Sequence, residues 1–197
     1  VEFAVWVLDS GSDLSAEEKR SLFPVTTVYE GHPGSNYDYI RPDQIRWYSE
    51  TSALLKASNG GKVVPGLMAF HIPLQESYIA WENRGGLTYT GDKREDVCAS
   101  AVNSGLFSVL LQNGDIKAVV NGHDHINDFM IEYYGIKLCQ AVTPTAENIY
   151  HDDSILGGRV FVISEENPSE VETYISYVHE QAQKPDFSDA EELPSGS

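Results

Sequence analysis

Two histidines stand close together in this 197-residue chain, in a setting that suits metal binding. His123-Asp124-His125 follows an apolar run and Gly122, so a single residue separates the two imidazoles. Neutral imidazole is a good ligand for Zn, Fe, Cu or Ni, and a second histidine nearby favours a metal site. The alternative is a polar loop whose histidines are incidental.

A third histidine, His71, follows another apolar run, and Pro73 restricts the backbone beside it. A single histidine after a strand usually has a packing or surface role. However, ligands of open α/β sheets bind at the carboxyl ends of the strands. Because both histidine segments follow apolar runs, we expect His71, His123 and His125 to converge.

Hydrophobic runs and turn residues predict the elements that position these histidines. Residues 1–8, 65–70 and 116–120 read as neighbouring strands, with an amphipathic helix over 42–57 packed on them. A hairpin over 129–138 and paired strands within 159–177 complete a mixed sheet flanked by helices, an α/β (α+β sandwich) fold. Shorter helices are expected over 13–23, 76–81 and 103–111, the first with Ser15 and Glu18 as a capping box. Residues 1–179 then form one domain, and 180–197 an acidic polar tail.

The excess of acidic residues argues against some classes of binding partner. The chain has 13 Lys and Arg against 30 Asp and Glu, a formal net charge of −17. Such a surface repels phosphate backbones and anionic lipid, so we expect no nucleic acid and no membrane partner. No apolar run reaches the roughly 18 residues of a membrane span. Phosphate chemistry stays possible, because bound cations reverse the local field.

Cysteines and the N-terminus say less about the protein. Cys98 and Cys139 allow at most one disulfide, and free buried thiols are the preferred interpretation. No signal segment is visible, and the chain begins with Val1. The compartment therefore stays open, with a secreted protein slightly favoured.

The two histidine segments together resemble a known family. Phe70-His71-Ile72-Pro73-Leu74-Gln75-Glu76 and Gly122-His123-Asp124-His125-Ile126-Asn127-Asp128 are similar to segments of the calcineurin-like metallophosphoesterases, in their purple-acid-phosphatase-related branch. Shorter stretches at 8–11, 42–47, 103–107 and 158–160 agree, so the resemblance spans roughly residues 3 to 178.

The resemblance implies a phosphoester hydrolase with two metal ions, drawn from Fe, Zn and Mn, held between packed sheets. It places His71 and His123 on one metal and His125 on the other. Asp124 is expected to face solvent, although it could instead orient an imidazole. Asn127 and Asp128 are expected to support the ligands. Tyr150 and His151, in a loop that would border the site, are candidates for substrate contact.

The chain also departs from the family. Its Asp-x-His, Gly-Asp-x-x-Asp and Gly-Asn-His-Asp motifs, which supply the other ligands, the bridging carboxylate and the catalytic histidine, have no counterpart here. Residues 91–96 come in the wrong order to replace them, and we expect an exposed loop. The chain thus resembles only the C-terminal half of a four-layer metallophosphoesterase fold and carries no catalytic residue of its own.

If the chain is half of a metallophosphoesterase, its metal binding, turnover and partners can be predicted. The chain alone should hold at most one metal weakly and should not turn over substrate. Its expected partners are a phosphoester substrate, the missing N-terminal half, and a second copy paired through an exposed sheet edge. An inactive binding or regulatory module is the main alternative, and a simple metal-binding protein with three histidine ligands is a further one.

Overall fold

The computed structural model describes residues 2–22, 36–145 and 153–178. The loop predicted over 25–36 lies almost entirely outside these ranges, and Tyr150, His151 and the tail over 180–197 lie wholly outside them. None of the helices within the described ranges combines the length and apolar character that crossing a bilayer requires.

Within these ranges, six strands form one mixed sheet in the order β1-β2-β4-β6-β5-β3. Their bounds are Ala4–Val7 (β1), Gly66–Ala69 (β2), Tyr89–Thr90 (β3), Ile116–Asn121 (β4), Met130–Tyr133 (β5) and Ile136–Gln140 (β6). Neighbours among β1, β2, β4 and β6 pair in parallel, whereas β5 pairs antiparallel with β6, and β3 with β5. The three predicted strands are therefore neighbours, and the predicted hairpin is β5–β6. The α/β fold with a mixed sheet is confirmed.

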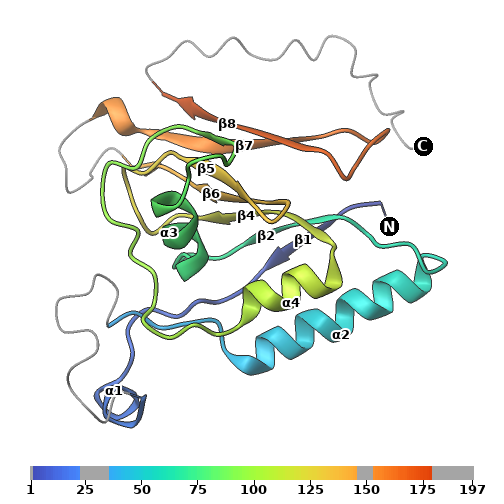
Figure 1. Cartoon of the computed structure of the whole chain (residues 1–197), viewed down its shortest axis with the longest axis horizontal. Helices are drawn as coiled ribbons and strands as arrows, with labels where there is room; N and C mark the ends of the chain where they lie inside the picture. Colours follow the sequence, from blue (N-terminus) through green and yellow to red (C-terminus); the bar gives the residue numbers. More distant parts are fainter. Residues whose placement is uncertain (1, 23–35, 146–152, 179–197) are drawn as a thin grey trace, which may run out of the picture.

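Helices cover one face of this sheet and a strand pair covers the other (Figure 1). The helices are α2 (Pro42–Ser58), α3 (Gln75–Glu82) and α4 (Leu106–Asn113), and the strands are β7 (Gly157–Ile163) and β8 (Val171–Tyr177), joined to the rest through the short 3-10 turn η1 (Asp153–Ile155). Tyr48, Trp81 and Leu110 of the three helices belong to the larger apolar core. Val171 of β8 packs with Leu67 and Ala118 on the opposite face. The layers are thus helices, mixed sheet and strand pair.

Local sequence accounts for where the helices begin. At α1 (Ala16–Leu22), the Ser15 Oγ accepts the Glu18 N–H at 3.2 Å, and Glu18 Oε2 accepts the Ser15 N–H at 2.9 Å, which is the predicted capping box. α4 begins three residues later than predicted. Its preceding residue, Gly105, has a φ of +77° and donates its N–H to Asn103 Oδ1. This left-handed turn suits glycine and delays the first helical turn.

Strand β1 forms one edge of the sheet, and part of its surface is bare. Trp6 is buried beneath α2, whereas Val5 and Val7 are 63% and 72% exposed. Parallel strands are normally covered on both faces. The edge and the outer face of β1 therefore offer an apolar surface to another strand.

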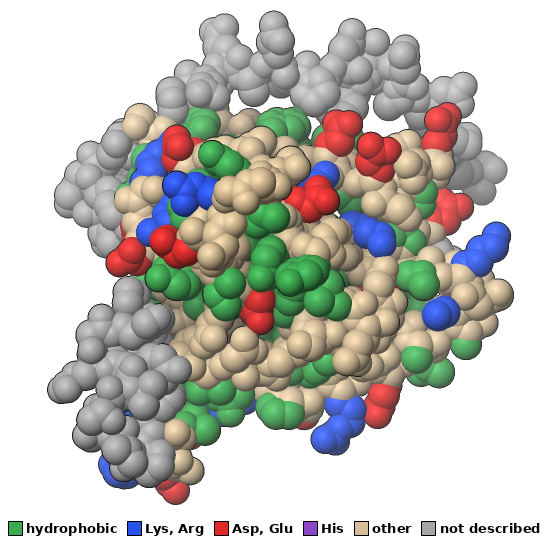
Figure 2. Space-filling view, viewed as in Figure 1, with side chains coloured by type: hydrophobic (Ala, Val, Ile, Leu, Met, Phe, Trp, Pro, Cys, Tyr) green, Lys and Arg blue, Asp and Glu red, His purple; other side chains and the backbone are tan. Residues whose placement is uncertain are grey.

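Acidic side chains gather elsewhere on the molecule. Figure 2 shows Asp and Glu side chains over the β7–β8 pair, where Glu165, Glu166, Glu170 and Glu172 are exposed. This surface will attract cations without forming a specific site.

A buried polar network joins α2 to the start of β4. The Tyr48 hydroxyl donates to Asp115 Oδ1, and the Ser52 hydroxyl donates to Asp115 Oδ2 at 2.7 Å. Tyr48 and Asp115 are almost wholly buried. The carboxylate therefore depends on these two donors.

We predict that Tyr48→Phe lowers the free energy of unfolding by about 1–3 kcal/mol, because it leaves a buried acceptor short of a donor. Urea denaturation measures the effect. Tyr78→Phe is the matched control, since Tyr78 is 43% exposed on α3. Equal stability of the two variants would contradict the assignment.

Candidate functional site

The backbone around His71 is held from both neighbouring strands. The Ile72 N–H donates to the hydroxyl of Ser10, a buried residue that follows β1, at 2.9 Å. From the other side, Asn121 Nδ2, at the end of β4, donates to the Phe70 carbonyl at 3.0 Å. The peptide groups before and after His71 are thus fixed, which sets the direction of its side chain.

His71 and His123 meet at this edge of the sheet. Nε2 of His71 and Nδ1 of His123 lie 3.2 Å apart, with the two ring planes at 82°. Two Zn–N bonds of about 2.0–2.1 Å at a tetrahedral angle would place their nitrogens about 3.4 Å apart. The pair therefore fits two ligands of one metal ion.

Tyr37 supports this pair and was not found from the sequence. Its ring packs edge-on against His123, with 4.4 Å between ring centroids. Its carbonyl accepts the Ser100 hydroxyl at 3.0 Å. No spacing signal points to Tyr37, because it comes from the segment before α2 and reaches the site only through the tertiary fold.

His125 lies close enough to influence the other two imidazoles but does not complete a cluster with them. Its charge contributes to lowering the pKa of both His71 and His123. Within residues 2–22, 36–145 and 153–178, however, no three His, Cys, Asp or Glu side chains are arranged to hold a metal ion. The structure thus brings two of the three predicted ligands together.

Partial desolvation disfavours the charged form of the paired imidazoles, although His71 is exposed and His123 is half-buried. Desolvation, followed by the charge of His125, holds the pKa of His71 below its ordinary value. Desolvation and the charges of His71 and His125 likewise lower the pKa of His123, opposed by Glu95 and Asp13. Neutral imidazole has the free lone pair that a metal needs.

Asp124 does not face solvent, so that expectation is wrong. It is only 2% exposed, and its Oδ1 accepts the Cys98 N–H at 3.1 Å. Asn127 Nδ2 donates to its Oδ2 at 3.4 Å. Desolvation raises the pKa of Asp124 to about 6, against the lowering effect of these hydrogen bonds. The side chain turns into the protein while its two neighbours remain partly exposed.

Asn127 and Asp128 hold a neighbouring loop. Asn127 Oδ1 accepts the N–H groups of Arg94 and Glu95 at 2.8 and 3.0 Å. Asp128 Oδ1 accepts the Asp92 N–H at 2.6 Å. Asp92, Arg94 and Asp96 of the loop over 91–96 are exposed, as expected, but Lys93 and Glu95 are partly buried and the backbone is docked against the histidine segment.

Asp128 also ties the histidine segment to the β7–β8 pair. Its Oδ2 accepts the Tyr177 hydroxyl and lies 2.8 Å from Arg94 Nη2. Arg159 of β7 donates to the carbonyls of Asp128 and Phe129. Arg159 belongs to the 158–160 stretch that carried part of the resemblance, whereas Tyr177 gave no signal in the sequence.

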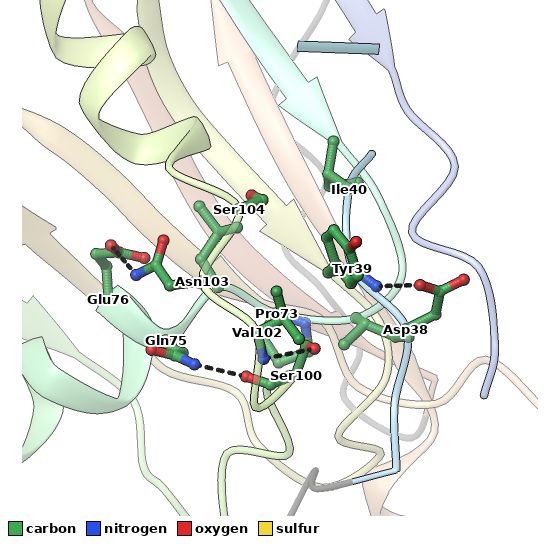
Figure 3. Close-up of a pocket in the computed structure, with 12 residues that line it drawn as sticks. Asp38, Tyr39, Ile40, Pro73, Gln75, Glu76, Ser100, Val102, Asn103 and Ser104 are labelled. Carbon is green, nitrogen blue, oxygen red and sulfur yellow. Dashed lines mark hydrogen bonds between the residues drawn. The ribbon is translucent and has the colours of Figure 1, made fainter. Parts of the chain in front are cut away.

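A small hollow lies along the segment that follows His71. Figure 3 shows its wall, where Gln75 donates to the Ser100 carbonyl and Asn103 to Glu76. Its volume of about 20 Å³ has room for one water molecule. The hollow is therefore too small for a phosphoester.

The lowered pKa values predict a pH dependence of stability. Between the ordinary value of 6.5 and the lowered values, the unfolded chain binds more protons at His71 and His123 than the folded chain does. The stability present above pH 6.5 is therefore lost as the pH falls. Asp124, with its raised pKa, acts in the opposite direction.

Comparison with variants isolates the histidine contribution. We expect the loss of urea stability from pH 7.5 to pH 5.5 to be smaller in His71→Asn and in His123→Asn than in the unchanged chain. Glu50→Gln, on the surface of α2, should follow the unchanged chain. Identical pH profiles for all four proteins would contradict the assignment.

Comparisons with known proteins support the family indicated by the histidine segments. No family model matches the chain, and no solved structure matches it significantly. A protein of Arabidopsis thaliana named "Probable inactive purple acid phosphatase 14" is 38% identical over 114 residues, 55% of this chain and 28% of its own length. Those numbered 29 and 28, from the same plant, are 38% and 33% identical over 109 and 103 residues.

These two matches each cover 52% of this chain, and 27% and 25% of the relatives. The matched stretch thus spans about a quarter of the length of each curated relative. Over about half its length, the chain is a relative of the purple acid phosphatases, which confirms its resemblance to the purple-acid-phosphatase-related metallophosphoesterases.

Proposed function

We propose that the chain supplies part of the metal site of a phosphoester hydrolase. The observation that carries this proposal is the 3.2 Å separation between His71 Nε2 and His123 Nδ1. Their geometry suits a shared Fe, Zn or Mn ion, and their lowered pKa values favour the neutral, ligating form. His125 would then serve a second metal, as the resemblance implies.

The residues of this chain would bind and orient the metals, while other parts of the protein complete the site. A bound pair of metal ions supplies positive charge that stabilises the phosphoryl oxygens and activates water. Two cations at close range also need an anionic group between them. The described ranges contain no cluster of three ligands. As the resemblance implies, the remaining ligands would come from a longer protein.

Strand β1 offers the place for such an addition. Its free edge and the exposed side chains of Val5 and Val7 suit a strand from an N-terminal half of the same protein. A second copy of the chain, pairing edge to edge, is the alternative occupant. The formal net charge of −17 opposes self-association and favours the first arrangement.

An inactive binding or regulatory module is the second candidate function. The observation that favours it is the word "inactive" in the names of the three relatives. Such a module would keep the fold, and even one metal, without turnover. Both candidate functions include the pair of His71 and His123. They differ in whether other parts of the protein add the remaining metal ligands and the catalytic groups.

We predict weak, specific Zn²⁺ binding by the chain alone, measured by competition with a chromophoric chelator. His71→Ala and His123→Ala should each lower the affinity at least tenfold, because each removes a ligand. Glu50→Gln removes one exposed carboxylate and should leave the affinity unchanged, which controls for binding to the acidic surface. Affinity that survives both histidine substitutions would contradict the proposal.

Turnover distinguishes the two candidate functions. The chain alone should not hydrolyse p-nitrophenyl phosphate at a useful rate. A protein that adds the sequence preceding Val1 in its gene should hydrolyse it, and His123→Ala should abolish that activity. Metal binding without turnover in the longer protein would favour the inactive module. Turnover by the 197-residue chain with all three histidines replaced by alanine would exclude the proposed site.

A further inference from the structure

The loop over 92–98 carries none of the predicted ligands. It nevertheless makes most of the polar contacts to residues 122–128, which carry His123 and His125. We define the histidine loop as residues 122–128 and the clasp as residues 92–98. We infer that the clasp positions the histidine loop and that Asn127 is its central positioning residue. The inference rests on the proposed function only in so far as the positioned histidines are metal ligands.

Asn127 joins the two segments through both ends of its amide. The side chain is fully buried, and its Oδ1 accepts two consecutive N–H groups of the clasp, those of Arg94 and Glu95. Its Nδ2 donates to Asp124 Oδ2 within the histidine loop. A buried amide with these partners fixes the distance between the segments, because losing any partner would leave polar groups unsatisfied.

The clasp also holds the residues on both sides of His125. Before it, Asp124 Oδ1 accepts the Cys98 N–H at 3.1 Å. After it, the Ile126 N–H donates to Glu95 Oε1 at 2.8 Å. The His125 carbonyl itself accepts the Thr143 N–H at 2.9 Å. The backbone on either side of the imidazole is therefore constrained.

Close approach at the residue just before the clasp requires a glycine. Gly91 has a φ of +74°, and a Cβ there would lie 2.5 Å from the Asp128 carbonyl oxygen and 2.7 Å from its Oδ1. The adjoining Asp92 carbonyl accepts the Asp128 N–H at 3.2 Å. Gly91→Ala would therefore push the clasp away from the histidine loop without removing any polar group.

Removing a group that holds a metal ligand in place typically lowers the metal affinity about 10- to 100-fold. Asn127→Ala removes the central contact, and Gly91→Ala separates the segments by steric conflict. Glu95→Ala removes an acceptor, whereas Glu95→Gln keeps an oxygen at the same place. Asn83→Ala, at the end of α3, is the matched control for loss of an asparagine side chain.

Two measurements on the intact chain test the inference. The first records imidazole ¹H–¹⁵N NMR spectra without metal, together with hydrogen exchange of the Arg94 and Glu95 amides. We expect Asn127→Ala, Gly91→Ala and Glu95→Ala to alter the His123 and His125 signals, with faster amide exchange at positions 94 and 95 in Asn127→Ala. Asn83→Ala should leave the imidazole spectra unchanged, whereas Glu95→Gln, which also removes a charge that acts on His123, should alter them less than Glu95→Ala does.

The second measurement is Zn²⁺ affinity, which should fall 10- to 100-fold in the three disruptive variants, stay unchanged in Asn83→Ala, and fall less in Glu95→Gln than in Glu95→Ala. Unaltered imidazole spectra in both Asn127→Ala and Gly91→Ala, with thermal unfolding showing them folded, would overturn the inference. Failure of the unchanged chain to bind Zn²⁺ would instead overturn the proposed function, and the metal-free spectra would still decide whether the clasp exists.

Discussion

The hydrogen bonds that fix the backbone around His71 connect the fold to the candidate site. Parallel strands bring their carboxyl ends to the same edge of a sheet, so β1, β2 and β4 deliver Ser10, His71 and His123 to one place. Ser10 and Asn121 then bind the peptide groups next to His71 from opposite sides. The sheet register decides which ring atoms meet, because a shift along either neighbouring strand would break these contacts. The 3.2 Å approach of the two imidazoles is thus a consequence of strand order.

Neighbouring side chains within residues 122–128 point in different directions and make different contacts. His123 and His125 remain partly exposed, whereas Asp124 and Asn127 turn inward and bind each other and the loop over 92–98. The inward carboxylate is desolvated, so its pKa rises, and the paired imidazoles are desolvated, so theirs fall. Both shifts reduce charge in the metal-free site. A metal ion would restore positive charge at a point where the protein supplies neutral donors.

Strands, the long helix and the strand-end position of the histidines were predictable, because each depends on local pattern. Apolar runs bounded by turn residues identified β1, β2 and β4, and Pro42 with the glycines after Asn59 identified α2. The delayed start of α4 depends on the left-handed conformation of Gly105, which sequence spacing does not reveal. Tyr37 and the inward turn of Asp124 depend on contacts between distant segments. The docking of the loop over 91–96 depends on such contacts too, since it binds the histidine segment largely through its backbone N–H groups.

The central claim is that His71 and His123 together bind one metal ion. X-ray absorption at the zinc edge of the singly loaded 197-residue chain tests it most directly, because imidazole rings give a distinct multiple-scattering pattern. The account predicts at least two imidazole nitrogens at about 2.0–2.1 Å, and one fewer in His123→Ala. A zinc ion surrounded only by oxygen atoms, or the same imidazole number in the unchanged chain and in His123→Ala, would contradict it.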